Sequence, residues 1–224
     1  MRRRPLTCHD GAPELTAVPN ADPHGTPRTR IDLALAFPGE GMTTESPSST
    51  INTYSGIRID PLAPAPDRIR LEDVAHGLSQ TCRFSGQSEF FYSVASHSLF
   101  VSYELAREHD SVVQLYGLLH DAAEAYITDL PRPVKRRIDE FDAIEERILE
   151  ATWQRLDVPE PTEDEWAAVM DADDRLFRYE ATELLNGYRP TEQPSLEYEL
   201  TPCAPTEVRQ QFLERADRLR SEVE

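Results

Sequence analysis

Helical periodicity is the feature that most limits how this chain can fold. From about residue 68 onward, apolar residues recur at spacings of three and four, as at Leu71, Val74, Ala75 and Leu78. That spacing places them on one face of an amphipathic helix. Further helical segments are predicted at 93–109, 112–126, 139–156, 162–186 and about 205–222. The sequence therefore predicts an all-α bundle.

Local signals predict where several of these helices begin and end. Ser111 is suited to cap the helix that follows it. Thr162 together with Glu165 makes a capping-box pattern, and Asn186-Gly187 is typical of a helix C-terminus. The sequence DLPRP should interrupt the chain after the 112–126 helix, because proline lacks a backbone N–H and bars continuation.

The N-terminal stretch differs from the remainder of the chain. Residues 1–50 are rich in Pro, Thr, Ser and Gly and show no helical or strand period. We expect either a disordered tail or a mis-annotated extension that precedes a true start at Met42. The next segment, 51–64, alternates apolar and polar residues around Gly56, which predicts a short β-hairpin or an extended arm. One domain is expected over 51–224.

Composition excludes several classes of partner. The formal net charge is −18, and the 23 basic residues include a single lysine, Lys135. An acidic surface repels duplex nucleic acid and anionic membranes. It is also suited to concentrated salt, which favours a halophilic source; a GC-rich genome that favours arginine codons is the alternative. No apolar run is long enough to predict a transmembrane helix.

The cysteines bear on the compartment. Cys8, Cys82 and Cys203 are scattered, and their spacing indicates neither a disulfide framework nor a zinc site. A reducing, cytoplasmic location is therefore expected.

A His-Asp pair late in an apolar segment is the most informative chemical feature. His120 and Asp121 could both reach one ion if that helix end faces a pocket, and imidazole and carboxylate are good ligands for divalent metals. Taken alone, such a pair is more typical of a partly buried histidine beside an acid. Glu124 follows on the same helix face, and His97 lies near the first turn of the preceding helix. The later stretch DADDRLF sets aspartates among apolar residues, where a metal would offset their desolvation.

The order of these motifs resembles the HD-domain superfamily of metal-dependent phosphohydrolases, and within it the 5′-deoxynucleotidase-like branch. The matching stretches are EDVAHGLSQTCRFSG, SVASHS, GLLHDAAEAYITDLPRPVK and ADDRLFRYEATEL, which cover roughly residues 68–190. The resemblance implies an HD-domain helical bundle with a core of about five or six helices. It also implies one bound divalent ion, which could be Mn, Co, Fe, Mg or Zn.

The resemblance implies a set of metal ligands. They fall on His97, His120, Asp121 and one aspartate of DADD. Asp173 is the preferred fourth ligand because it keeps the family's spacing to Glu180 and Glu183; Asp174 is the alternative. Ser96, directly before His97, stands where relatives often carry an acid that could support the imidazole.

The resemblance also implies catalytic and substrate-binding residues. Glu124 is expected to accept a proton from water. Asp129 is expected to act near the leaving oxygen or, alternatively, to cap the next turn. Arg83 is expected at the phosphate, because its planar fork suits phosphate oxygens. Phe84 stands where related nucleotidases carry tryptophan; it keeps the apolar wall without the indole N–H, so a strict preference for deoxyribose is not implied.

The activity that follows is hydrolysis of (deoxy)nucleoside 5′-monophosphates to nucleoside and phosphate by attack of a metal-activated water. One alternative is a dNTP triphosphohydrolase, which usually demands several cationic groups. Another is a non-catalytic nucleotide-binding HD module, which typically loses a ligand or the adjacent acid. The expected partner is a small phosphorylated substrate. The apolar residues of the last helix are suited to packing within a monomer or across a homodimer.

Overall fold

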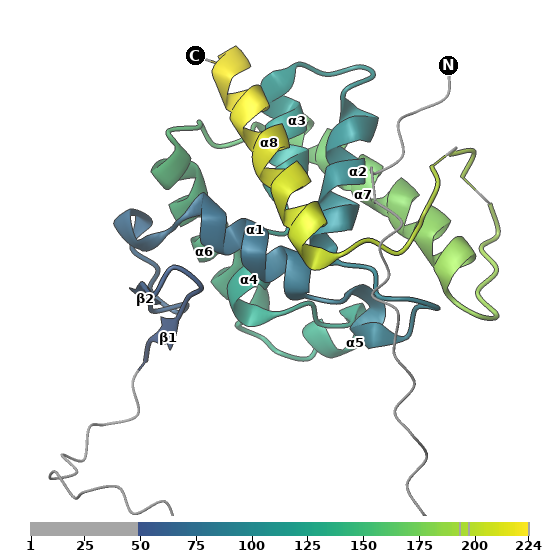
Figure 1. Ribbon diagram of the computed structural model, residues 1–224, viewed down its shortest axis with the longest axis horizontal. Helices are drawn as coiled ribbons and strands as arrows, with labels where there is room; N and C mark the ends of the chain where they lie inside the picture. Colours follow the sequence, from purple (N-terminus) through teal and green to yellow (C-terminus); the bar gives the residue numbers. More distant parts are fainter. Residues whose placement is uncertain (1–48, 193, 197, 224) are drawn as a thin grey trace, which may run out of the picture. The chain divides into compact units, whose positions relative to one another are not determined.

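Helices dominate the part of the chain that the structure describes. The computed structural model describes residues 49–192, 194–196 and 198–223, so the predicted N-terminal extension lies almost wholly outside it. The helices are α1 Leu71–Gln80, α2 Val94–Leu105, α3 Ser111–Leu119, α4 Glu124–Ile127, α5 Arg132–Lys135, α6 Phe141–Leu156, α7 Glu163–Leu184 and α8 Pro205–Val223 (Figure 1). Two 3-10 turns, η1 Pro66–Arg68 and η2 Arg83–Gly86, flank α1.

The helices bury their apolar faces against one another. α2 and α3 form an antiparallel pair, α8 packs across α1, α2 and α3, and α7 packs against α2 and α3 (Figure 1). The side chains of Leu78, Leu99, Leu115 and Phe212 are all fully buried. The long helices α7 and α8 are amphipathic, and their apolar faces are buried in this shared core.

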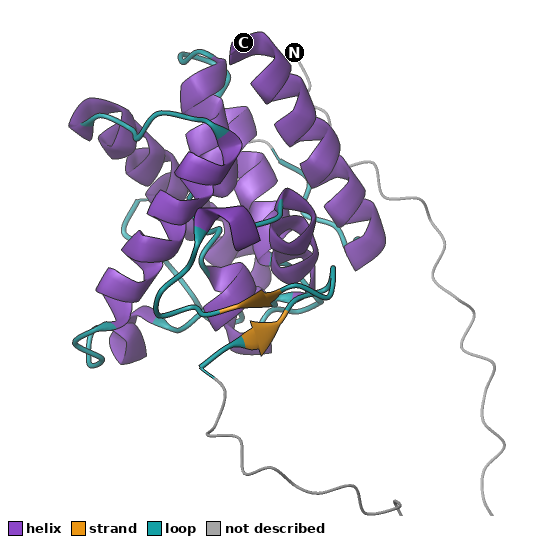
Figure 2. Ribbon diagram, turned by 90° about the vertical axis from the view of Figure 1, so that its left-hand side faces the viewer, coloured by secondary structure: helices purple, strands orange, loops and turns teal. Residues whose placement is uncertain are grey.

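Of the two structures predicted for residues 51–64, the short hairpin is present and the extended arm is not. β1 Ile51–Asn52 pairs antiparallel with β2 Arg58–Ile59. The strands are the only ones among the described residues and lie at one edge of the helices (Figure 2). Gly56 has φ +82°, a left-handed conformation that favours glycine. The backbone N–H and hydroxyl of Ser55 donate to the Asp73 carboxylate at 2.7 and 2.8 Å, which fastens the turn to α1.

One predicted helix cap is confirmed and another is wrong. Thr162 caps α7: its hydroxyl accepts from the Glu165 N–H at 3.3 Å, and its own N–H donates to the Glu165 carboxylate at 2.7 Å. At α3 the cap is Asp110 rather than Ser111, because the Asp110 carboxylate accepts from the Val113 N–H at 3.2 Å. A carboxylate beside the helix N-terminus also gains from the helix dipole.

The predicted helix 112–126 is interrupted at the His-Asp pair. α3 ends at Leu119, and α4 begins only at Glu124. Between them the backbone makes tight bonds three residues apart, such as the Glu124 N–H to the Asp121 carbonyl at 2.9 Å. The ring of His120 bonds the Gly117 carbonyl, which in a regular helix would accept from the N–H four residues on. The sequence expectation of one continuous helix face is therefore wrong, although the turn still brings these residues to one cavity.

Two further observations concern membranes and cysteines. Across the described ranges, no helix combines the length and apolar character that crossing a bilayer requires. Cys82 is a free thiol.

A close backbone contact joins α1 to the helix that carries Glu124. A Cβ added at Gly77 would lie 2.6 Å from the carbonyl oxygen and 2.9 Å from the Cα of Ala125. In an exposed helix, replacing glycine by alanine would stabilise by about 1 kcal/mol. Here we expect Gly77→Ala to destabilise the protein by about 1–3 kcal/mol, because backbone cannot rotate away. Denaturant unfolding measures the change.

Gly117→Ala is the comparison for Gly77→Ala. Its added Cβ would meet the ends of two side chains, Cδ1 of Leu105 and Cγ1 of Val101, which can adjust. We expect a smaller loss of stability than at Gly77. An unchanged or raised unfolding midpoint for Gly77→Ala would show that α1 and α4 can separate without cost.

Candidate metal centre

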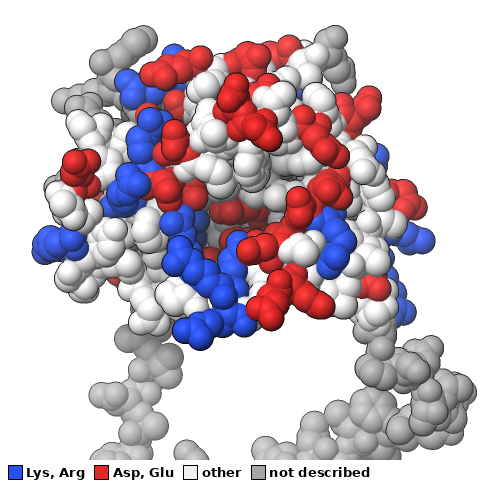
Figure 3. Space-filling model, turned by 180° about the vertical axis from the view of Figure 1, so that it is seen from behind, with Lys and Arg blue, Asp and Glu red and all other residues white. Residues whose placement is uncertain are grey.

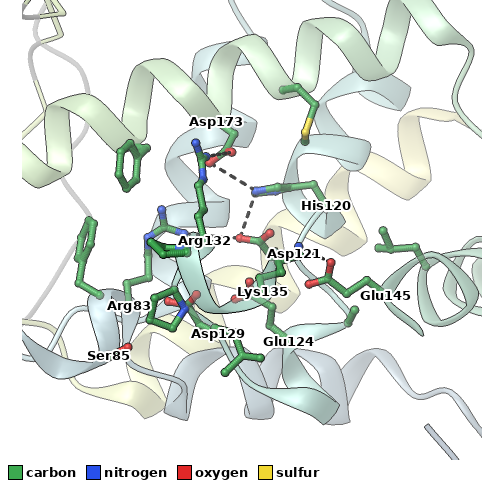
Figure 4. A pocket seen from close by; sticks show the side chains of 18 of the residues that line it. Arg83, Ser85, His120, Asp121, Glu124, Asp129, Arg132, Lys135, Glu145 and Asp173 are labelled. Carbon is green, nitrogen blue, oxygen red and sulfur yellow. Dashed lines mark hydrogen bonds and ion pairs between the residues drawn. The ribbon is translucent and has the colours of Figure 1, made fainter. Parts of the chain in front are cut away.

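Two imidazoles and two carboxylates from three separate parts of the chain converge on one point. His97 lies in the first turns of α2. His120 and Asp121 follow the end of α3, and Asp173 lies midway along α7 (Figure 4). Ligand atoms of His97, His120 and Asp121 all lie within 4.8 Å of one another. Oδ1 of Asp173 lies 2.9 Å from Nε2 of His97 and 4.0 Å from Nε2 of His120. The structure therefore brings together all four residues that the sequence predicts as ligands.

The imidazoles are oriented so that one nitrogen of each faces the carboxylates. Nδ1 of His97 lies 2.9 Å from the carboxylate of Glu180, and Nδ1 of His120 lies 2.9 Å from the Gly117 carbonyl. Both partners are acceptors, so each Nδ1 carries the hydrogen. Each Nε2 is buried and makes no well-aligned hydrogen bond to any described residue. Lone pairs that face carboxylate oxygens repel unless a cation lies between them, so this donor set fits a metal ion.

The ionisable groups of the candidate centre shift one another's pKa values. Burial and the charge of Arg83 oppose protonation of His97, but the carboxylates of Glu180 and Asp173 outweigh them and raise its pKa to about 9. Burial alone would raise the pKa of Asp121, yet the neighbouring imidazoles of His120 and His97 lower it to about 2. The pKa of Asp173 is likewise depressed against the effect of burial, mainly by its contact with His97. Without a metal, a proton on His97 balances the acids.

Metal binding should therefore release a proton. At pH 7 the His97 imidazole, with a pKa of about 9, is protonated, whereas a metal ligand must be neutral. We expect a divalent ion to displace about one proton at neutral pH, and its apparent affinity to rise roughly tenfold per pH unit until about pH 9. Calorimetric titration with Mn²⁺ in two buffers of different ionisation enthalpy counts the protons. Equal affinities at pH 6.5 and 8.5 would contradict this reading.

The two candidate aspartates of α7 are distinguished by what they contact. Asp173 reaches both imidazoles through Oδ1, while its Oδ2 lies 3.3 Å from the guanidinium of Arg132. Asp174 instead pairs with Arg132 at 3.0 Å and with Arg178 at 4.0 Å. The geometry favours Asp173, the preferred residue of the sequence analysis, over Asp174.

A cavity of about 640 Å³ opens beside these residues. Its walls include the two predicted catalytic acids, Glu124 and Asp129, three cations, and an apolar set of Phe84, Leu149, Trp166, Met170 and Phe177. The cations are Arg83, Arg132 and Lys135. On the face opposite to that of Figure 1, the surface is hollowed, with basic side chains gathered along one side of the hollow and acidic ones along the other (Figure 3). The cavity is large enough for a small phosphorylated molecule.

Glu124 is a buried acid without a hydrogen-bond partner for one oxygen. Its Oε2 makes no hydrogen bond to any described residue, and the side chain lines the cavity beside Asp121. Burial raises the pKa of Glu124 well above its ordinary value, and the charges of Asp121 and Asp129 raise it further. Burial also raises the pKa of Asp129. Acids held in this state are suited to exchange protons with a ligand in the cavity.

Arg83 and Phe84 sit where the chain turns back after α1. Arg83 is buried, with NH1 3.6 Å from Asp121 Oδ2 and Nε 3.3 Å from Glu180 Oε2. Phe84, Ser85 and Gly86 all have positive φ, of 55°, 51° and 73°. Two of these residues are not glycine, so the turn carries backbone strain of the kind found at binding sites. Both predicted substrate residues line the cavity.

Three residues near the centre were missed or misread in the sequence. Glu180 supplies the carboxylate partner of His97 that Ser96 does not, and it comes from a helix 83 residues away. The i+7 spacing from Asp173 on the apolar face of α7 was the available signal. Arg132 and Lys135, which line the same cavity, were not predicted as part of the site. They are ion-paired, Arg132 to Asp173 and Asp174, and Lys135 to Glu145.

Comparison with known proteins supplies relatives without a stated activity. No protein-family model matches the chain. The chain is 39% identical over 111 residues to an uncharacterised protein of Rhodobacter capsulatus, a match that covers 47% of this chain and 57% of that protein. It is 35% identical over 111 residues to the uncharacterised protein YfdR of Escherichia coli, covering 50% of this chain and 60% of YfdR. The chain thus spans less than two thirds of each relative's length.

Proposed function

We propose that this chain is an HD-domain phosphohydrolase that cleaves (deoxy)nucleoside 5′-monophosphates with the help of one divalent ion. The observation that carries the proposal is the pair of buried Nε2 atoms of His97 and His120, which make no well-aligned hydrogen bond to a described residue and face the carboxylates of Asp121 and Asp173 at the wall of a cavity. The motif order of the sequence supports the family, and the cavity supports a small ligand.

The residues of the chain would divide the chemistry among them. His97, His120, Asp121 and Asp173 would hold the ion. When bound, a divalent ion polarises a phosphoryl oxygen and makes a nearby water molecule more acidic. Glu124 accepts the proton of the attacking water, because it is an acid of raised pKa with a free oxygen beside the ligands.

Two more residues would handle the ester itself. Arg83 stays charged at any working pH and directs its guanidinium toward the phosphate, close to Asp121. Asp129, whose pKa is raised by burial, donates a proton to the leaving oxygen. Phe84 and Phe177, whose ring centroids lie 5.9 Å apart, offer an apolar wall to the remainder of the substrate.

The charges of the cavity favour a monophosphate over a triphosphate. All three cations of the cavity already pair with carboxylates, Arg83 with Asp121 and Glu180, Arg132 with Asp173 and Asp174, and Lys135 with Glu145, so little positive charge is left for a polyanion. A triphosphate carries several more charges than one guanidinium and one ion offset. A non-catalytic nucleotide-binding module is disfavoured because all four ligand positions and Glu124 are filled.

The test is turnover after metal reconstitution. The protein is stripped with chelator, loaded separately with Mn²⁺, Co²⁺, Fe²⁺, Mg²⁺ or Zn²⁺, and assayed in high salt on nucleoside mono- and triphosphates, with phosphate and triphosphate both quantified. We expect phosphate release from monophosphates that depends on the added metal. Triphosphate as the sole product would replace the monophosphatase assignment, and no turnover with any metal would end the hydrolase proposal.

A further inference from the structure

One fully buried carboxylate connects the metal ligands to the arginine of the cavity. Glu180 has no solvent exposure and lies two turns after Asp173 on the same face of α7. Burying an ionised carboxylate is costly unless charged or hydrogen-bonding partners surround it. Glu180 has three such partners: Arg83 in η2, Tyr92 just before α2, and His97 within α2.

The contacts divide between the two oxygens of Glu180. Oε1 accepts from Nδ1 of His97 at 2.9 Å and from the Tyr92 hydroxyl at 2.8 Å. Oε2 lies 3.1 Å from the same Nδ1 and 3.3 Å from Nε of Arg83. Tyr92 is itself buried, so its hydroxyl holds the carboxylate in one orientation. The carboxylate therefore touches one predicted metal ligand and the predicted phosphate-binding arginine at once.

We propose that Glu180 is a positioning residue that fixes the His97 imidazole and the Arg83 guanidinium relative to each other, and so sets the distance between the metal and the bound phosphate. This inference rests on the proposed roles of His97 and Arg83. A carboxylate on Nδ1 points Nε2 of His97 toward Asp121 and Asp173. The contact with Nε of Arg83 leaves the outer end of that guanidinium toward Asp121, with NH1 3.6 Å from its carboxylate.

Glu180→Gln distinguishes a residue that positions His97 and Arg83 from one that only fills space. The amide keeps one oxygen, which can go on accepting from His97 and Tyr92. Its NH₂ group then faces Nε of Arg83, donor against donor, and the negative charge is gone. A residue that only fills space would tolerate this nearly isosteric change. A positioning residue would not tolerate it, because the contacts with His97 and with Arg83 both depend on the negative charge of the carboxylate.

The experiment measures binding without turnover. Metal-free protein is titrated with Co²⁺, and the visible absorption of the Co²⁺-loaded protein reports the geometry around the ion; the loaded protein is then titrated with inorganic phosphate. We expect Glu180→Gln to weaken Co²⁺ binding about 10–100-fold, to shift the visible bands, and to weaken phosphate binding about tenfold. Glu183→Gln, an exposed acid one turn further along α7, should change none of these.

A double-mutant cycle tests whether the phosphate effect passes through Arg83. In an Arg83→Ala background, Glu180→Gln should alter phosphate affinity less than about twofold while its effect on Co²⁺ persists. An equal phosphate effect in both backgrounds would overturn the link to Arg83. Wild-type Co²⁺ affinity, spectrum and phosphate affinity in Glu180→Gln would overturn the whole inference.

Further outcomes keep the inference testable and separate from the proposed function. If Glu180→Gln does not fold, Tyr92→Phe takes its place, because it removes the hydroxyl that holds the Glu180 carboxylate. It should weaken Co²⁺ binding a few-fold and shift the visible bands. An unchanged Co²⁺ titration would contradict the positioning role of Glu180. Altered Co²⁺ and phosphate binding in a protein that hydrolyses no nucleotide would retain the positioning role and reject the hydrolase. Turnover that Glu180→Gln leaves intact would do the reverse.

Discussion

Asp121→Asn is expected to remove the bound metal and at least about 10³-fold of the phosphohydrolase activity. Asp121 Oδ2 lies 3.2 Å from Nε2 of His120 and 4.0 Å from Nε2 of His97, so its carboxylate faces both imidazoles. Asparagine keeps the shape but not the charge. A metal contributes several kcal/mol to the transition state, and each 1.36 kcal/mol corresponds to a tenfold change in rate. Metal content by elemental analysis and the rate of phosphate release measure the two effects.

The control for Asp121→Asn is Asp171→Asn, which removes an exposed acid from the same DADD stretch. It should keep both metal and activity. Asp174→Asn extends the comparison, because Asp174 pairs with Arg132 and Arg178 rather than with the imidazoles, and it should keep the metal. Full activity and metal content in Asp121→Asn would remove the candidate centre altogether.

Glu124→Gln is expected to lower kcat by about 10²–10⁴-fold while the metal stays bound. Glutamine cannot accept the proton of the attacking water, yet it leaves the four ligands untouched. The pKa of Glu124 is raised by burial and by the charges of Asp121 and Asp129. Because a base acts in its ionised form, the wild-type rate should fall as the pH drops through that pKa. The pH profile of Glu124→Gln should lack this acidic limb.

Metal content gives the internal control for Glu124→Gln. A variant that loses both metal and activity would indicate that Glu124 supports the ligands instead of handling the proton. A variant with wild-type kcat would leave Asp129 as the acid to be tested next, since its pKa is also raised and it lines the same cavity.

Local features of the fold could be predicted from the sequence. The Thr162 and Glu165 capping box, the Gly56 hairpin and the last helix depend on residues close together in the chain, and each is present. The continuous helix through His120 was wrong because a side-chain bond to the Gly117 carbonyl competes with the helix ladder. The Ser111 cap was wrong because Asp110, one residue earlier, makes the cap instead.

The candidate site likewise has one part that could be predicted from the sequence and one part that could not. His97, His120, Asp121 and Asp173 could be predicted, because their motif order is visible in the sequence and the structure brings them together. Glu180 as the partner of His97, and Arg132 as the partner of Asp173, depend on contacts across 83 and 41 residues. The i+7 spacing places Glu180 on the same face of α7 as Asp173, but it does not identify the partner of either residue, because these pairs form only when α2, α5 and α7 meet.

The guanidinium of Arg132 contacts the Asp173 carboxylate and therefore competes with a metal ion for it. The Arg132 side chain is 50% exposed, whereas the Asp173 side chain is only 16% exposed. Dissolved ions screen an exposed pair of charges over about 3 Å at molar salt and about 10 Å at tenfold dilution, while a directly coordinated cation is shielded far less. Concentrated electrolyte therefore loosens the arginine first and leaves Asp173 to the ion. Metal affinities of this protein are comparable only at matched ionic strength.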